Sequence, residues 1–237
     1  EITVNGEKYL YFGGTSYLGM ATNKEFQEIV YESLKKWGTF YGSSRNANVK
    51  LAIYEKFENY FSDYLGAETA LTVSSGTLAG KMVIDYLAKS KVSFFHYPKT
   101  HPAILAPNSM PLFINDKLHP QLQNTFFEDI VITVDAILPL ETTPTSFDFL
   151  DEISSQKKIT LVLDESHSLG IIGKLGEGIF ATIQSKKVYR KIMISSLGKA
   201  LGLSGGIIAS DKEFIDNICS EPVFVSSSGA NPAYLEA

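Results

Sequence analysis

Lys199 is the side chain of this sequence that is best placed for chemistry. It lies in the run Ser196-Leu-Gly-Lys199-Ala-Leu-Gly202, directly after a β-type segment at 191–195. Lysines usually lie on solvated faces, so a lysine held among small residues at the end of a strand favours a chemical role. Its amine can form a Schiff base with an aldehyde. Alone the motif is weak, because Gly-Lys pairs also occur in ordinary turns.

A second motif suggests what such a lysine would work with. The apolar run 161–163 ends in Asp164-Glu-Ser-His167, which places a carboxylate at the end of a buried strand. There it can keep the ring nitrogen of pyridoxal phosphate (PLP) protonated, while His167 can donate a hydrogen bond to the phenolate oxygen of the same ring. The alternative is an aspartate that caps the next turn, beside a packed histidine.

Other segments could bind anions or stack on a ring. Ser74-Ser75-Gly76-Thr77 lies between a strand and a helix, where free N–H groups and the helix dipole can hold a phosphate. The alternative there is a plain helix N-cap. His101 opens a helix-like segment and is either a ring-stacking residue or a surface imidazole. The loops 42–48 and 226–229 are either polar turns or anion contacts.

Composition excludes several function classes. The chain has 237 residues, 44% of them hydrophobic and 20% charged, with a net charge of −5, so it can form a sizeable core. No basic block indicates nucleic-acid binding, and no apolar run has the ~20 residues of a membrane span. The four histidines and the single Cys219 lack the spacing of a metal site. One cysteine also fits a reducing compartment, so a cytoplasmic location is expected.

From Glu68 onward, strand-like and helix-like segments alternate, which predicts an α/β fold with a mainly parallel sheet. The expected strands are 69–73, 92–96, 111–114, 130–134, 160–164, 191–195 and 206–209. The expected helices between them are 76–88, 102–106, 147–157 and 211–219. The link from Ser195 to Gly206 is too short for a helical crossover. The last strand is therefore expected to run antiparallel to its neighbours.

The expected organisation has three parts. Residues 1–65 form an N-terminal arm and two helices, one of which spans 49–64 with Asn48 as its N-cap and its apolar residues in the core. Residues 66–225 form the large domain. Residues 226–237 begin a further helix, with Pro232 at an early helical position. Because the helical pattern ends without a cap, a C-terminal small domain is expected beyond it.

Taken together, these motifs resemble the α-oxoamine synthases among the fold-type I PLP enzymes, over nearly the whole chain. The matching segments are Ser16-Tyr-Leu-Gly19, Tyr41-Gly-Ser-Ser-Arg45, Ser75-Gly-Thr77, Thr100-His101-Pro-Ala103, Asp164-Glu-Ser-His167-Ser-Leu-Gly170, Ser196-Leu-Gly-Lys199 and Val225-Ser-Ser-Ser228. The resemblance implies the large domain of that fold. This is a mostly parallel seven-stranded sheet with one antiparallel strand and helices on both faces.

The resemblance also implies roles for individual residues. Lys199 would hold PLP and act as the proton-transfer base, and His101 would stack on the ring as the second catalytic residue. Asp164 would bind the ring nitrogen and His167 the 3-oxygen. Arg45 would contact the substrate, and no metal is implied. The phosphate would be held by Ser75, Gly76, Thr77 and Ser196, with Ser226 and Ser227 reaching the phosphate of the partner subunit in a homodimer with shared active sites.

The implied reaction joins an amino acid, alanine or glycine, to an acyl-CoA thioester with loss of carbon dioxide, giving an α-aminoketone. The biotin route, with alanine and a pimeloyl thioester, is the first expectation. The chain departs from the family pattern at Thr15, 46–51 and 134–139. These departures lie on the substrate side, so an aminotransferase or a C–C lyase of the same fold stays open.

Two other classes are disfavoured. A non-catalytic subunit that only binds a partner tends to lose the lysine, whereas Lys199, Asp164, His101 and His167 are all present. A Rossmann dehydrogenase would need a Gly-rich dinucleotide fingerprint after its first strand, and none follows 69–73.

Overall fold

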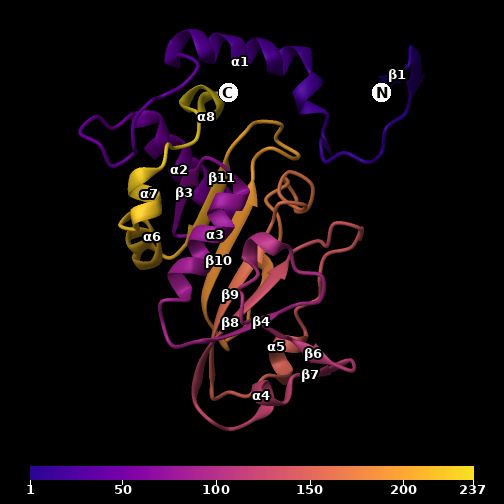
Figure 1. Ribbon diagram of the computed structural model, residues 1–237, viewed down its shortest axis with the longest axis vertical. Coiled ribbons are helices and arrows are strands. Elements are labelled where there is room, and N and C mark those ends of the chain that lie inside the picture. Colours follow the sequence, from indigo (N-terminus) through magenta and orange to yellow (C-terminus); the bar gives the residue numbers. More distant parts are fainter.

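A seven-stranded sheet runs through the centre of the computed structural model, which describes residues 1–237 (Figure 1). The strands, in spatial order, are β3 (Thr69–Val73), β11 (Gly206–Ser210), β10 (Val188–Ser196), β9 (Lys157–Asp164), β8 (Glu128–Asp135), β4 (Ser93–His96) and β5 (Met110–Pro111). β11 runs antiparallel to both of its neighbours, and every other neighbouring pair is parallel. The mostly parallel sheet with one antiparallel strand is therefore confirmed.

The sheet separates two hydrophobic clusters because successive side chains of each strand point to opposite faces. In β9, Leu161 and Leu163 belong to one cluster and Val162 to the other. The first cluster includes side chains of α2 (Ala52–Leu65) and α5 (Phe149–Glu152). The second includes side chains of α3 (Gly76–Leu87) and α6 (Lys212–Cys219), and α3 crosses one face of the sheet in Figure 1.

The remaining elements complete the chain. They are β1 (Ile2–Val4), β2 (Glu7–Tyr9), α1 (Lys24–Trp37), β6 (Phe113–Ile114), β7 (Lys117–Leu118), α4 (Pro120–Gln123), α7 (Pro222–Ser226) and α8 (Pro232–Glu236), with 3₁₀ turns at Met20–Thr22, Pro102–Ile104 and Phe180–Thr182. α1 lies beside α8, near both chain ends, at the top of Figure 1. None of the helices combines the length and hydrophobicity that a membrane crossing requires.

Tertiary contacts override several local expectations. The predicted helix 147–157 is wrong beyond Glu152, because Lys157 instead begins β9. Its buried Nζ donates to Asn124 Oδ1 (2.9 Å), the carbonyl of Phe126 (3.0 Å) and Glu128 Oε2 (2.9 Å), which ties β9 to the segment that leads into β8. Such a buried cation needs these acceptors.

The other differences lie at element ends. Asn48 is not the N-cap of α2, which begins after Leu51, and the predicted core residues Val49 and Tyr60 are exposed. The predicted strand 111–114 is divided at Leu112: Pro111 pairs with β4, whereas Phe113–Ile114 forms a hairpin with β7. The segment 102–106 forms only a 3₁₀ turn.

Gly206 is the position where a side chain is expected to harm the fold most clearly. A Cβ there would lie 2.2 Å from the backbone oxygen of Ser75, so Gly206→Ala must push β11 away from the start of α3. We expect a loss of about 3 kcal/mol in the free energy of unfolding, the upper end for overpacked sites. Urea denaturation measures it. Gly42→Ala, whose Cβ would make only ordinary contacts at 3.8 Å, is the control, and equal losses in both variants would contradict the packing.

Candidate active site

The turn that carries Lys199 is closed by backbone hydrogen bonds. The N–H of Leu197 donates to the carbonyl of Gly205 (3.0 Å), and the N–H of Leu203 donates to the carbonyl of Leu197 (3.2 Å). The antiparallel return of β11 makes this short connection possible. It leaves Lys199 half-buried at the end of β10, with its Nζ 2.9 Å from Nε2 of His167.

Two buried carboxyl groups lie at the same edge of the sheet. Asp135 ends β8 and Asp164 ends β9, and the two are paired in register. Asp164 Oδ1 accepts the N–H of Ser166 (2.8 Å). Asp135 Oδ2 accepts the N–H of His101 (2.9 Å), whereas its Oδ1 is buried without a partner. Burial, and then the Asp164 charge, raise the pKa of Asp135 to about 7.

The nitrogens that face these acids are shifted toward their neutral forms. Burial lowers the pKa of Lys199, and the charges of Asp164 and Asp135 oppose that shift only in part. Burial, and then the Lys199 charge, lower the pKa of His167. A neutral amine is the form of lysine that attacks a carbonyl. The site therefore favours the reactive form of Lys199.

The N-terminus of α3 lies beside the end of β10. Ser75 Oγ caps the helix by accepting the N–H of Leu78 (3.2 Å), while the N–H groups of Gly76 and Thr77 belong to the first turn and have no intrahelical acceptor. A Cβ on Gly76 would lie 2.8 Å from Cα and Cβ of Ser196. This closeness brings the free N–H groups next to the Ser196 hydroxyl, as an anion site requires.

His101 directly precedes the 3₁₀ turn Pro102–Ile104. Its ring Nδ1 accepts the N–H of Ala103 (3.1 Å), so it caps the 3₁₀ turn as a surface imidazole would. Its backbone, however, is held by Asp135, and its charge acts on His167. The structure thus gathers Lys199, Asp164, His167 and His101 at one edge of the sheet. The start of α3, with Ser75, Gly76 and Thr77, adjoins them through Ser196.

Arg45 lies elsewhere and its donors are occupied. Its guanidinium forms a two-point ion pair with Glu58 and donates to the carbonyl of Thr72 (3.1 Å). It also lies over the ring of Tyr54, 4.1 Å from the ring centroid. These contacts join the loop after α1 to α2 and β3. The predicted substrate contact of Arg45 stays a prediction.

Ser226 and Ser227 lie at the end of α7, where no hydrogen bond joins them to the residues around Lys199. Ser227 Oγ donates to the carbonyl of Phe224 (3.4 Å), and the next residue, Ser228, forms a β-bridge with Ser44. Their predicted contact with the phosphate of a partner subunit stays a prediction.

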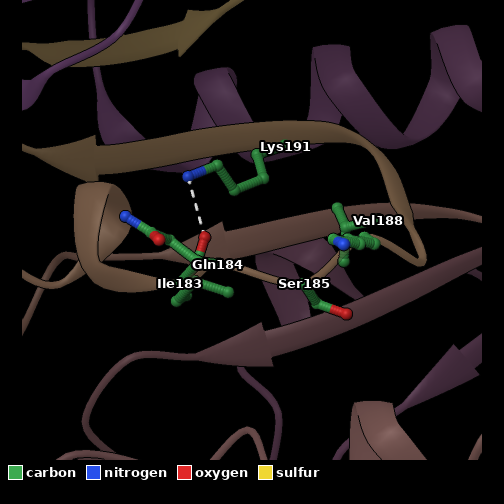
Figure 2. Close-up of a pocket in the computed structure, with 6 residues that line it drawn as sticks. Ile183, Gln184, Ser185, Val188 and Lys191 are labelled. Carbon is green, nitrogen blue, oxygen red and sulfur yellow. Dashed lines mark hydrogen bonds between the residues drawn. The ribbon is translucent and has the colours of Figure 1, made fainter.

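A second lysine of β10 has a structural use. Figure 2 shows a surface depression lined by Ile183, Gln184, Ser185, Val188 and Lys191. Lys191 Nζ donates to the carbonyls of Phe180 (2.9 Å) and Ile183 (3.0 Å), and so holds the 3₁₀ turn against β10. Burial lowers the pKa of Lys191 as well. Its amine, however, is hydrogen-bonded to these two backbone carbonyls, which gives it a structural role.

Three residues of the site were not predicted from the sequence. Asp135 ends an apolar strand as Asp164 does, so the same signal could have found it. The hydroxyl of Tyr17 lies 2.5 Å from His167 Nδ1. Tyr17 belongs to the segment Ser16-Tyr-Leu-Gly19, but no local pattern connects it to His167. Ser166 Oγ accepts the N–H of Ser196 (2.9 Å) and has no signal in the sequence.

Comparison with known proteins places the chain among PLP-dependent proteins. Residues 52–177, more than half of the chain, match the model of the DegT/DnrJ/EryC1/StrS aminotransferase family. Residues 143–237 match the model of aminotransferase class I and II. The chain is 28% identical over 96% of its length to a protein of Methanococcus vannielii provisionally named 8-amino-7-oxononanoate synthase. It is 24% identical over its whole length to the 8-amino-7-oxononanoate synthase of Lysinibacillus sphaericus.

The chain belongs to the DegT/DnrJ/EryC1/StrS aminotransferase family, and its likeness to 8-amino-7-oxononanoate synthases supports the resemblance to the α-oxoamine synthases. A serine palmitoyltransferase from S. paucimobilis has the same fold, with a TM-score of 0.82 at 17% identity over 98% of this chain and 61% of that one. The fold-type I assignment is therefore confirmed. The chain spans 64% and 63% of the lengths of the two curated relatives.

The residues present fit the PLP of this family. Asp135 and Asp164 are adjacent, and Oδ1 of Asp135 has no hydrogen-bond partner. Acidic groups at this position favour a protonated ring nitrogen. The first turn of α3 offers N–H groups to a phosphate, and Gly76 keeps the approach of Ser196 open. Lys199, with a lowered pKa, offers an amine to an aldehyde. Together these groups would hold the ring nitrogen, the phosphate and the aldehyde of the cofactor.

Replacing Arg45 separates a structural role from a substrate role. We expect Arg45→Met to lower the free energy of unfolding by about 3–5 kcal/mol, because Glu58 would be left largely buried without its cation. Chemical denaturation measures this loss. Lys212→Met, which breaks an exposed pair with Asp216, should cost about 1 kcal/mol or less. Unchanged stability in Arg45→Met, with lost activity alone, would instead support the substrate contact.

The raised pKa of Asp135 predicts a dependence of stability on pH. Because its folded-state pKa lies above the unfolded value, its favourable contribution is present in acid and is lost as the pH rises through about 7. We expect cofactor-free protein to lose up to about 4 kcal/mol more between about pH 4 and pH 8 than Asp135→Asn does.

Denaturant curves across this pH range measure the difference. Burial also raises the pKa of Glu165 to about 7, but Glu165 is present in both proteins, so the difference isolates Asp135. Asp129→Asn, at the exposed start of the same strand, is the matched control. Parallel curves for wild type and Asp135→Asn would contradict the buried carboxyl.

Proposed function

We propose that this chain binds PLP and catalyses the condensation of an amino acid with an acyl-CoA thioester, with loss of carbon dioxide, to give an α-aminoketone. One observation carries the proposal: the amine of Lys199 lies against His167 at the sheet edge where two buried carboxyl groups end their strands. The likeness to proteins named 8-amino-7-oxononanoate synthase supports the reaction class.

Each anchor has a proposed task. Asp164 holds the proton of the ring nitrogen, and Asp135 lies beside Asp164 on the neighbouring strand. His167 donates its ring N–H to the 3-oxygen, and His101 covers the ring face. The N–H groups of Gly76 and Thr77 bind the phosphate together with the hydroxyls of Ser75 and Ser196.

Lys199 moves the proton of the reaction. PLP, when bound, supplies an aldehyde for the substrate amine and a ring that withdraws electrons from the α-carbon of the substrate. Lys199 takes the α-proton on Nζ, since burial lowers the pKa of its amine and so favours the form that accepts a proton. After the acyl group has been joined and carbon dioxide lost, Nζ returns a proton to the same carbon. His167, 2.9 Å away, orients the amine throughout.

The substrates and assembly are further parts of the proposal. Alanine and a pimeloyl thioester, the biotin route, are proposed first, since curated relatives carry the name 8-amino-7-oxononanoate synthase. A homodimer with shared sites would give Ser226 and Ser227 their phosphate contact, and a C-terminal small domain would complete the substrate side. A cytoplasmic location and the substrate contact of Arg45 also remain predictions.

An aminotransferase is the second candidate, because both matching family models describe aminotransferases. The two reactions part after proton removal. A synthase releases free CoA and carbon dioxide when the amino acid and the acyl thioester are both present. An aminotransferase releases a 2-oxo acid from the amino acid without any thioester. Measuring both products from one reaction mixture decides between them.

Lys199→Ala tests the cofactor anchor. We expect wild type loaded with PLP to be yellow and Lys199→Ala to lose that absorption, because no other amine lies at the site to hold the aldehyde. Visible spectra of the two proteins measure this. Lys212→Ala, which removes an exposed lysine, is the control and should stay yellow.

The same spectra, taken after adding alanine, glycine and serine in turn, identify the amino substrate. One of the three should shift the absorption of wild type, and that amino acid should then release CoA from an acyl thioester. If none of the three amino acids changes the absorption spectrum of wild type, the synthase proposal is contradicted.

A further inference from the structure

A tyrosine of the N-terminal arm reaches the candidate site. The hydroxyl of Tyr17 lies 2.5 Å from Nδ1 of His167, 150 residues along the chain, and the two ring centroids are 6.0 Å apart. The other ring nitrogen, Nε2, lies 2.9 Å from Nζ of Lys199. The three side chains form one continuous row of hydrogen bonds from a half-exposed phenol to the half-buried amine.

The surroundings decide which atom donates in each bond. Burial raises the pKa of Tyr17, so its phenol keeps its proton and can donate. Burial lowers the pKa of His167, and a neutral imidazole holds a single N–H. If the phenol donates to Nδ1, the ring proton must be on Nε2. That proton is then directed at the amine of Lys199, 2.9 Å from Nε2.

The other charged groups around His167 do not bond to its ring, so Tyr17 and Lys199 determine which ring nitrogen carries the proton. Asp164 raises the pKa of His167 and His101 lowers it. Neither makes a hydrogen bond to the imidazole, whose two nitrogens are bonded only to Tyr17 and Lys199. The tautomer of a histidine is set by the hydrogen bond that its other nitrogen makes.

We infer that Tyr17 is a positioning residue that fixes His167 as the Nε2–H tautomer, with its proton directed at Lys199. This inference rests on the proposed function only for the use of that proton, which there is donated to the 3-oxygen of PLP. The wrong tautomer would present a lone pair to that oxygen instead of a proton. Tyr17 thus acts on the site through His167.

The tautomer can be read directly by ¹⁵N nuclear magnetic resonance of the imidazole nitrogens in the full-length, cofactor-free protein at about pH 8, above the ordinary pKa of histidine. The chain has four histidines, and the signals absent from His167→Gln identify the one of interest. Wild type should show His167 with the proton on Nε2. Tyr17→Phe should lower the ratio of the Nε2–H to the Nδ1–H form about tenfold, as expected for one lost hydrogen bond.

Controls separate positioning from simple packing. Tyr11→Phe removes a hydroxyl from an exposed residue of the same arm and should leave the ratio unchanged. If Tyr17 served only to pack the arm, Tyr17→Phe would also leave the ratio unchanged, and that result would overturn the inference. Wild-type His167 in the Nδ1–H form would overturn it too, and this measurement holds even if Tyr17→Phe fails to fold.

Cofactor binding is measured separately, by equilibrium dialysis of wild type against PLP. Absence of binding would contradict the proposed function while the tautomer result still stood. If wild type binds PLP while its His167 is in the Nδ1–H form, the role of Tyr17 is contradicted and PLP binding still stands. The two proposals can therefore fail independently.

Discussion

Two carboxyl groups buried side by side impose the main electrostatic condition on this protein. Asp135 and Asp164 end neighbouring parallel strands in register, so their charges lie close together away from water. Like charges in such a place cannot both persist unless a cation or a proton joins them. The pKa of Asp135 is raised to about 7, and Lys199 lies nearby at the same edge. A protonated ring nitrogen would also offset the negative charge, which is why this edge of the sheet suits PLP.

The neighbouring backbone is arranged so that other groups can reach this edge. The short β10–β11 connection holds Lys199 there, and β11 passes so close to the start of α3 that only glycine fits at Gly206. After β9, the buried Glu165 accepts the N–H of Ile179 (2.8 Å) and a hydrogen bond from Ser168, and so folds the following loop back on itself. His167 lies inside this loop, so the loop fixes where its ring can lie.

Local signals in the sequence predicted the sheet and much of the site. Lys199 and Asp164 each follow an apolar run, and the parallel order of β9 and β10 then brings them to one edge. Asp135 also follows an apolar run, but its position beside Asp164 depends on the register of β8 with β9, which no local pattern reveals. Tyr17 was missed because its partner lies 150 residues away. The helix predicted to reach Lys157 failed because Asn124 and Phe126, in the segment before β8, accept hydrogen bonds from the amine of that lysine.

Peptide mass spectrometry can locate the lysine that PLP joins. The PLP-loaded protein is reduced with borohydride, digested and analysed. We expect a single phosphopyridoxyl group on Lys199, because only this amine combines a lowered pKa with the carboxylates and the helix N-terminus that would hold the rest of the cofactor. Label spread over exposed lysines, with Lys199 unmodified, would contradict this expectation.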